Sequence, residues 1–138
     1  GVEGFMDDTL RDCRKNGYVS TILGRRRLVT DVRDQDSLKN KRQRNLSERI
    51  AINTVIQGSA ADLIKIAMIN VLKQLQTGNW TARLLLQIHD ELIFECPEDE
   101  IADLQEMVVH EMESAAELEV PLKVDVKTGP NWADCEPV

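Results

Sequence analysis

The stretch LLLQIHDELIFEC, residues 84–96, decides the fold because it joins two apolar segments through three adjacent polar residues. Its apolar residues are branched and aromatic types that favour strands. The pattern predicts a β-hairpin whose turn lies at His89 and Asp90. We expect both faces of the strands to be buried, and the tight turn to hold Asp90 and Glu91 outside the core. A rigid support of this kind suits a metal-binding carboxylate.

The size and composition of the chain favour a soluble protein with one substantial core. The chain has 138 residues, which is the length of one domain. No run approaches the roughly 18 apolar residues that a membrane span needs, so we expect no membrane association. The three cysteines lack a CxxC spacing, which indicates neither a disulfide framework nor a zinc site. A reducing, cytoplasmic compartment of a bacterial type fits best, and we expect a monomer.

The net charge of −7 is divided unevenly along the chain. Residues 11–49 hold twelve Lys or Arg against five Asp or Glu, whereas residues 50–138 hold five against sixteen. A basic surface on one part of the molecule is a reason to consider nucleic acid as a partner. The alternative is a solvated basic surface with no partner.

Hydrophobic spacing predicts helices and strands on both sides of the central hairpin. An amphipathic helix is expected from residue 2 to about residue 16, ended by Gly17. A small basic hairpin should follow, with Arg25, Arg26 and Arg27 at its tip. Further helices are expected over residues 41–57 and 59–75 and after Pro97, with a half-buried strand over 122–127.

Glycine and serine in the middle of the chain suggest a break between two helices. Gly58 is expected to end the first helix, and Ser59 to cap the second with Asp62 in its first turn. The predicted fold class is therefore α+β. An antiparallel sheet of about three strands should pack against helices, with an N-terminal helix and the basic hairpin added to it.

One helical face carries polar side chains at regular spacing. Arg49, Asn53 and Gln57 fall at i, i+4 and i+8, so they share one stripe of the predicted helix. Such side chains can donate to acceptors in a nucleic-acid groove without demanding one sequence. A solvent-facing polar edge explains the same spacing equally well.

The His89–Glu91 triplet admits several chemical interpretations. Turns are polar in general, so an ordinary surface turn is one alternative. Asp90 and Glu91 are hard oxygen ligands that suit Mg²⁺, although a two-metal site needs another carboxylate that the sequence does not identify. His89 has no companion at zinc-ligand spacing, and no serine stands in a G-x-S-x-G elbow, which argues against zinc chemistry and a serine hydrolase.

Four ordered motifs together resemble the C-terminal part of family A DNA polymerases, the DNA polymerase I family. They are GYVSTILGRRR (17–27), ERIAINTVIQGSAADLIK (48–65), QIHDELIFE (87–95) and VPLKVDVKTGPNW (120–132). The resemblance implies template-directed nucleotidyl transfer in DNA replication or repair. It implies a palm motif in which Asp90 is one of two metal-binding carboxylates, Glu91 an auxiliary acid and His89 a neighbour of the primer terminus.

The resemblance also implies the partners and cofactors of the site. Primer-template DNA and deoxynucleoside triphosphates are the expected partners, with two Mg²⁺ ions in the intact enzyme. Arg49, Asn53 and Gln57 are expected to line the minor groove. The basic hairpin residues Arg25, Arg26 and Arg27 are further candidates for DNA contacts.

By the same resemblance, the other palm carboxylate and the nucleotide-binding fingers helix would precede Gly1. We therefore interpret residues 1–47 as a fingers-derived part and residues 48–138 as the C-terminal palm portion. The segment by itself is expected to be catalytically inactive. The alternative function is a non-catalytic nucleic-acid-binding module with a polymerase-like fold.

Overall fold

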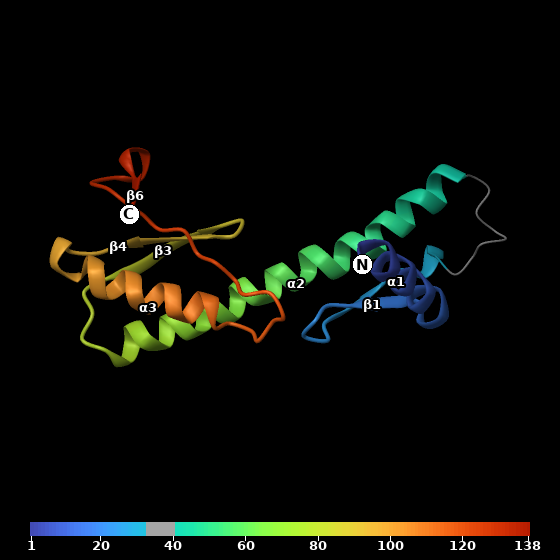
Figure 1. Cartoon of the computed structure of the whole chain (residues 1–138), viewed down its shortest axis with the longest axis horizontal. Coiled ribbons are helices and arrows are strands. Elements are labelled where there is room, and N and C mark those ends of the chain that lie inside the picture. The colour runs from blue at the N-terminus through green and yellow to red at the C-terminus, as the bar shows by residue number, and fades with distance from the viewer. Residues whose placement is uncertain (33–40) are drawn as a thin grey trace. The chain divides into compact units, whose positions relative to one another are not determined.

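The computed structural model describes residues 1–32 and 41–138, and these residues form two compact units. The first unit is Gly1–Asp62 and the second is Leu63–Val138, so the boundary falls within the long helix α2 (Lys41–Thr77) (Figure 1). Helices and small antiparallel sheets together confirm the predicted α+β class. The composition of residues 30–40 predicts an exposed loop or a short helical turn, and this segment lies mostly outside the described residues.

The first unit begins with helix α1 (Val2–Asn16), as the sequence predicts. Gly17 ends the helix in the left-handed conformation, with φ at 78°, and its N–H donates to the Cys13 carbonyl. Strands β1 (Tyr18–Ser20) and β2 (Arg26–Leu28) then pair antiparallel, and the 3₁₀ helix η1 (Thr30–Val32) follows. Five buried residues of α1, β1, α2 and the connecting segments form the core of this unit: Cys13, Val19, Val29, Val32 and Ala51.

Helix α2 is continuous, so the predicted break at Gly58 is wrong. A single glycine inside a helix costs only about 1 kcal/mol, which packing can offset. Gly58 lies where the segment after β1 closely approaches the helix, since a Cβ there would lie 2.9 Å from Thr21 Cγ2. Ser59 is not a helix cap either, because its hydroxyl donates to the Val55 carbonyl one turn earlier in the same helix.

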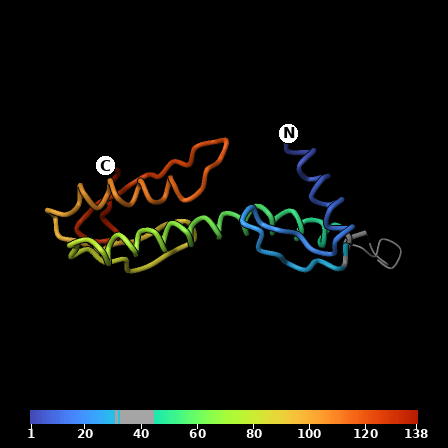
Figure 2. The backbone as a smooth tube through the Cα atoms, turned by 90° about the horizontal axis from the view of Figure 1, so that it is seen from below, coloured from blue at the N-terminus to red at the C-terminus, as the bar shows by residue number. Residues whose placement is uncertain are grey.

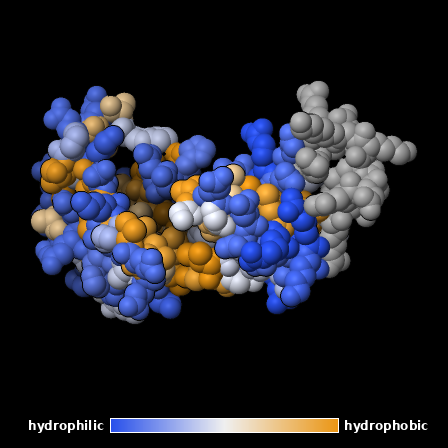
Figure 3. All heavy atoms as spheres, turned by 45° about the vertical axis from the view of Figure 1, so that its right-hand side comes forward, coloured by the Kyte–Doolittle hydropathy of each residue, from blue (hydrophilic) through white to orange (hydrophobic). Residues whose placement is uncertain are grey.

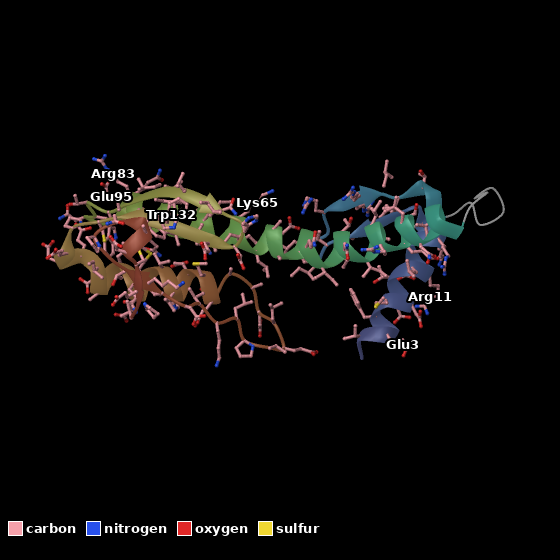
Figure 4. The ribbon with its side chains drawn as sticks, turned by 90° about the horizontal axis from the view of Figure 1, so that it is seen from above. Glu3, Arg11, Lys65, Arg83, Glu95 and Trp132 are labelled. Atoms are coloured by element: carbon pink, nitrogen blue, oxygen red, sulfur yellow. The ribbon has the colours of Figure 1, made fainter. Side chains whose placement is uncertain are left out.

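The central hairpin of the second unit forms as predicted. Strand β3 (Arg83–Ile88) pairs antiparallel with β4 (Glu91–Glu95), and Ile88 opposite Glu91 leaves a two-residue turn. Figure 4 shows the cross-strand partners Arg83 and Glu95 close together at the open end of the hairpin. The register shifts by one residue between Leu84 and Leu86, which is a β-bulge that the alternation of the sequence did not predict.

The core of the second unit lies between α2, the hairpin and helix α3 (Ile101–Glu113). Short helix η2 (Glu98–Glu100) follows Pro97 and leads into α3, as the sequence predicts. Figures 1 and 2 show α3 and the hairpin beside the last turns of α2. Four buried residues from these elements and the preceding loop form the cluster: Val71, Ala82, Leu104 and Val108.

The hairpin strands are less buried than predicted. In the described part of the chain, Leu85 and Leu86 keep 50% and 47% of their surface exposed. Figure 3 shows apolar side chains at the surface on one face of the molecule. The expectation that both faces of the hairpin are buried is therefore wrong.

The predicted strand over residues 122–127 is also wrong, except that its last residue, Lys127, lies in a strand. Within the described ranges the strands form three separate two-stranded sheets, the third pairing β5 (Lys127–Thr128) with β6 (Glu136–Pro137). The segment before β5 finds other partners, because the Val124 N–H donates to Glu113 Oε1 and the Val126 carbonyl accepts from the Val138 N–H. A further 3₁₀ helix, η3 (Trp132–Asp134), lies between β5 and β6.

Candidate nucleic-acid interface and metal-binding turn

The turn between β3 and β4 presents three polar side chains to solvent. His89, Asp90 and Glu91 are all exposed, and His89 has a φ of 54° in the left-handed region. A positive φ at the first turn residue is what tight hairpin turns need, and His adopts it more readily than most residues. The Gln87 side-chain amide donates to the His89 carbonyl, which braces the turn from β3.

The donor chemistry of this turn fits a hard divalent cation only in part. Asp90 and Glu91 supply carboxylate oxygens, and Mg²⁺ in proteins often takes only one or two carboxylates with water and phosphate oxygens. Across residues 1–32 and 41–138, no three His, Cys, Asp or Glu side chains gather in a way that could hold a metal ion. The turn therefore supplies part of a ligand set, and the carboxylate partner that two-metal chemistry requires is not found in the described residues.

The predicted polar stripe lies on an exposed face of α2 in the first unit. Arg49, Asn53 and Gln57 are all exposed, whereas Ala51 and Ile52 are buried on the opposite side of the helix. The spacing of the sequence thus predicted the exposed face of the helix. This arrangement leaves guanidinium and amide donors available along three turns.

The three hairpin arginines occupy different environments. Arg25 Nε lies 2.7 Å from Asp62 Oδ1, and its Nη2 donates to the Gly58 carbonyl. The Arg26 guanidinium stacks 4.7 Å from the centre of the Tyr18 ring. Arg27 Nη1 donates to Thr54 Oγ1 on α2. Only Arg25 precedes β2 in the turn, so the predicted cluster at the tip is spread over the turn and the strand.

Asp62 has a different role from the first-turn acid of a capped helix that the sequence suggested. It lies in the interior of α2, is 8% exposed, and accepts hydrogen bonds from Thr21 Oγ1 and Arg25 Nε. No local pattern signals this role, because its partners lie about forty positions earlier in the chain. An acid among small and apolar helix residues is the one sequence feature that could have raised the question.

Glu100 is a second acidic residue whose role the sequence did not reveal. Its carboxylate accepts from the backbone N–H groups of Thr81 and Ala82, just before β3 begins. The bond from the Thr81 backbone is the main cause that lowers the pKa of the Glu100 carboxyl, partial desolvation opposes it, and the Ala82 bond adds to it. Glu100 thus ties η2 to the start of the hairpin that carries Asp90.

Comparisons with known proteins agree on one family. The sequence profile of DNA polymerase family A matches residues 1–134. The DNA polymerase I proteins of Bacillus subtilis (strain 168) and Geobacillus stearothermophilus are 46% and 47% identical over 136 residues, which is 99% of this chain. The chain spans 15% of the length of either relative.

A solved structure gives the same result for the fold. The POL domain of Pol1 from M. smegmatis, in complex with DNA primer-template and dNTP, is 44% identical, with a TM-score of 0.82. The similarity covers 89% of this chain and 21% of that one.

Proposed function

Because the chain belongs to DNA polymerase family A, we propose that it is a segment of a DNA-directed DNA polymerase acting on primer-template DNA with deoxynucleoside triphosphates. The family match over residues 1–134 is the observation that carries this proposal. The similar POL domain of Pol1 was solved with primer-template DNA and dNTP, which supports the same partners here.

In this proposal Asp90 is a metal-binding carboxylate and Glu91 an auxiliary acid. The chain's own contribution is a tight turn, braced by Gln87, that holds the Asp90 carboxylate at the end of two paired strands. Bound Mg²⁺, two ions in the intact enzyme, supplies Lewis-acid stabilisation of phosphoryl oxygens. We propose that the remaining carboxylate comes from another part of the full-length polymerase, and that His89 lies near the primer terminus.

The exposed α2 face is proposed to contact the minor groove of the primer-template duplex. Acceptors in the minor groove are similar for all base pairs, so Arg49, Asn53 and Gln57 can donate there without reading sequence. The exposure of all three side chains on one helical face supports this role. Residues 1–47 remain proposed as fingers-derived and residues 48–138 as palm.

We also propose that the protein is soluble, monomeric and cytoplasmic. By length and composition alone, the α2 segment Asn45–Thr77 would be able to cross a membrane, a property that core helices of soluble proteins share. Within this segment Asp62 bonds to Thr21 and Arg25, which supports packing against protein rather than lipid.

Substitution of Asp90 tests the metal role. In the natural full-length protein with Mg²⁺, Asp90→Asn should abolish nearly all primer extension while leaving duplex binding close to normal. The matched control is Asp125→Asn, which removes an exposed carboxylate from the segment before β5 and should leave extension unchanged. Extension by Asp90→Asn at the parental rate would overturn the metal role and favour the non-catalytic binding module.

Extension by the purified 138-residue chain would overturn the proposal that the segment alone is inactive.

A further inference from the structure

The side chain of Asp62 joins the β1–β2 hairpin to helix α2 through both carboxylate oxygens. Thr21 Oγ1 donates to Oδ2 over 2.6 Å, and Arg25 Nε pairs with Oδ1 over 2.7 Å. Asp62 is 8% exposed, so the pair is largely shielded from water on the acid's side. Charge-assisted bonds of this length are among the stronger polar contacts in proteins.

Neighbouring contacts fix the hairpin over one turn of the same helix. The Ile22 N–H donates to Ser59 Oγ over 3.0 Å, and Arg25 Nη2 donates to the Gly58 carbonyl over 3.0 Å. Thr21 Oγ1 also accepts from the Arg25 N–H, so one hydroxyl connects the turn to Asp62. The missing side chain at Gly58 lets Thr21 approach the helix this closely.

The position of the hairpin decides where its two remaining arginines lie. Arg27 reaches Thr54 on α2, and Thr54 neighbours Gln57 because residues three apart are adjacent on a helix surface. Arg26 is held over Tyr18 on the paired strand. The guanidinium of Arg25 instead donates to Asp62 and to the Gly58 carbonyl.

We propose that Thr21, Arg25 and Asp62 form a positioning network, which holds the β1–β2 hairpin against α2 and keeps Arg27 beside the Arg49–Asn53–Gln57 face, and that Arg25 itself is not a DNA contact. This inference rests on the proposed DNA-binding role of that face, and it revises the grouping of Arg25 with Arg26 and Arg27. Asp62 therefore strengthens DNA binding although its charge opposes a polyanion.

The direction in which DNA affinity changes when Asp62 is substituted distinguishes positioning from simple electrostatics. Removing a negative charge near a DNA-binding face tightens binding if charge alone matters. Positioning predicts the opposite, with Asp62→Asn weakening primer-template affinity by roughly tenfold, within the range of coupled contacts. Asp7→Asn is the matched control, because Asp7 is an exposed acid on α1 of the same unit and its loss should not weaken binding.

The experiment measures the affinity of the natural full-length protein for a fluorescent primer-template duplex, well below the melting temperature of every variant. Thr21→Val keeps the side-chain shape but removes the donor to Asp62, and should weaken binding, whereas Thr21→Ser keeps the hydroxyl and should restore it. Arg25→Ala should also weaken binding, and the double variant with Asp62→Asn should bind no worse than the weaker single variant.

Arg49→Ala in the same assay tests the proposed DNA-binding face separately from the positioning network. Normal affinity of Arg49→Ala would overturn the proposed DNA-binding face itself. Weakened binding by Arg49→Ala together with parental or tighter affinity of Asp62→Asn and Thr21→Val would overturn the positioning network alone. Earlier melting of these variants with unchanged affinity would show a merely structural ion pair and would also overturn it.

Discussion

Gly58 on α2 and Thr21 beside β1 approach so closely that a Cβ on the glycine would lie 2.9 Å from Thr21 Cγ2. Gly58→Ala gains about 1 kcal/mol of helix propensity, as any such change inside a helix does. The overlap with Thr21 and the shift of the hairpin that relieves it should cost about 2 kcal/mol. We therefore expect a net loss of about 1 kcal/mol in the free energy of unfolding.

Gly4 on α1 is the matched control for this prediction, because nothing lies within 4 Å of the Cβ it would gain. Gly4→Ala should raise the free energy of unfolding by up to about 1 kcal/mol. Denaturant unfolding of the purified chain measures both variants. Stabilisation by Gly58→Ala as large as that by Gly4→Ala would contradict the close approach.

The hydrogen bonds to Glu100 predict a pH-dependent contribution to stability. Because the pKa of Glu100 is lowered in the folded state, folding favours the ionised carboxylate. The contribution is present above the pKa of the unfolded chain and is lost as the pH falls through the folded pKa. It should therefore be full at neutral pH and decline in the acid range.

Thermal melting of the parent and of Glu100→Gln measures this contribution. The parent should melt at a higher temperature than Glu100→Gln at neutral pH, and the difference should shrink as the pH approaches about 3. Glu98→Gln, which changes an exposed acid of the same short helix, is the control. A difference that stays constant over the acid range would exclude the carboxylate as its source.

The positive φ of His89 predicts how substitutions there change stability through the backbone conformation. A left-handed conformation costs a non-glycine residue about 1 kcal/mol, and glycine would relieve it while losing a similar amount through unfolded-state entropy. His89→Gly and His89→Asn should thus stay near parental stability, whereas His89→Val should lose about 1–2 kcal/mol because a branched Cβ opposes positive φ. Denaturant unfolding tests this order, and equal stability of Val and Asn would contradict it.

The local parts of the fold were predictable because their causes are local. Helical periodicity and Gly17 predicted α1, and the apolar runs around His89 predicted the hairpin and its turn. The errors concern residues whose partners are distant in sequence. Gly58 and Asp62 resemble a helix boundary locally, but their places are set by Thr21 and Arg25, far earlier in the chain.

The same distinction applies to the candidate site. The spacing of Arg49, Asn53 and Gln57 predicted a shared exposed face, since helix geometry alone determines it. The sequence could not separate Arg25 from Arg26, because adjacent arginines look alike until the hairpin is paired and Asp62 is placed. The alternation over residues 122–127 likewise predicted a strand, but pairing needs a neighbouring edge that no local pattern supplies.

The salt dependence of DNA binding tests whether Arg26 faces the phosphate backbone. Each lost phosphate contact reduces the slope of log affinity against log salt by about 0.9 for duplex DNA. Arg26→Ala in the natural full-length protein should show a reduction of this size. Arg11→Ala is the control, because Arg11 lies exposed on α1, 2.7 Å from Asp8, and its removal should leave the slope unchanged (Figure 4). Equal slopes for the two variants would remove Arg26 from the proposed interface, since a cation stacked on Tyr18 would then serve the hairpin alone.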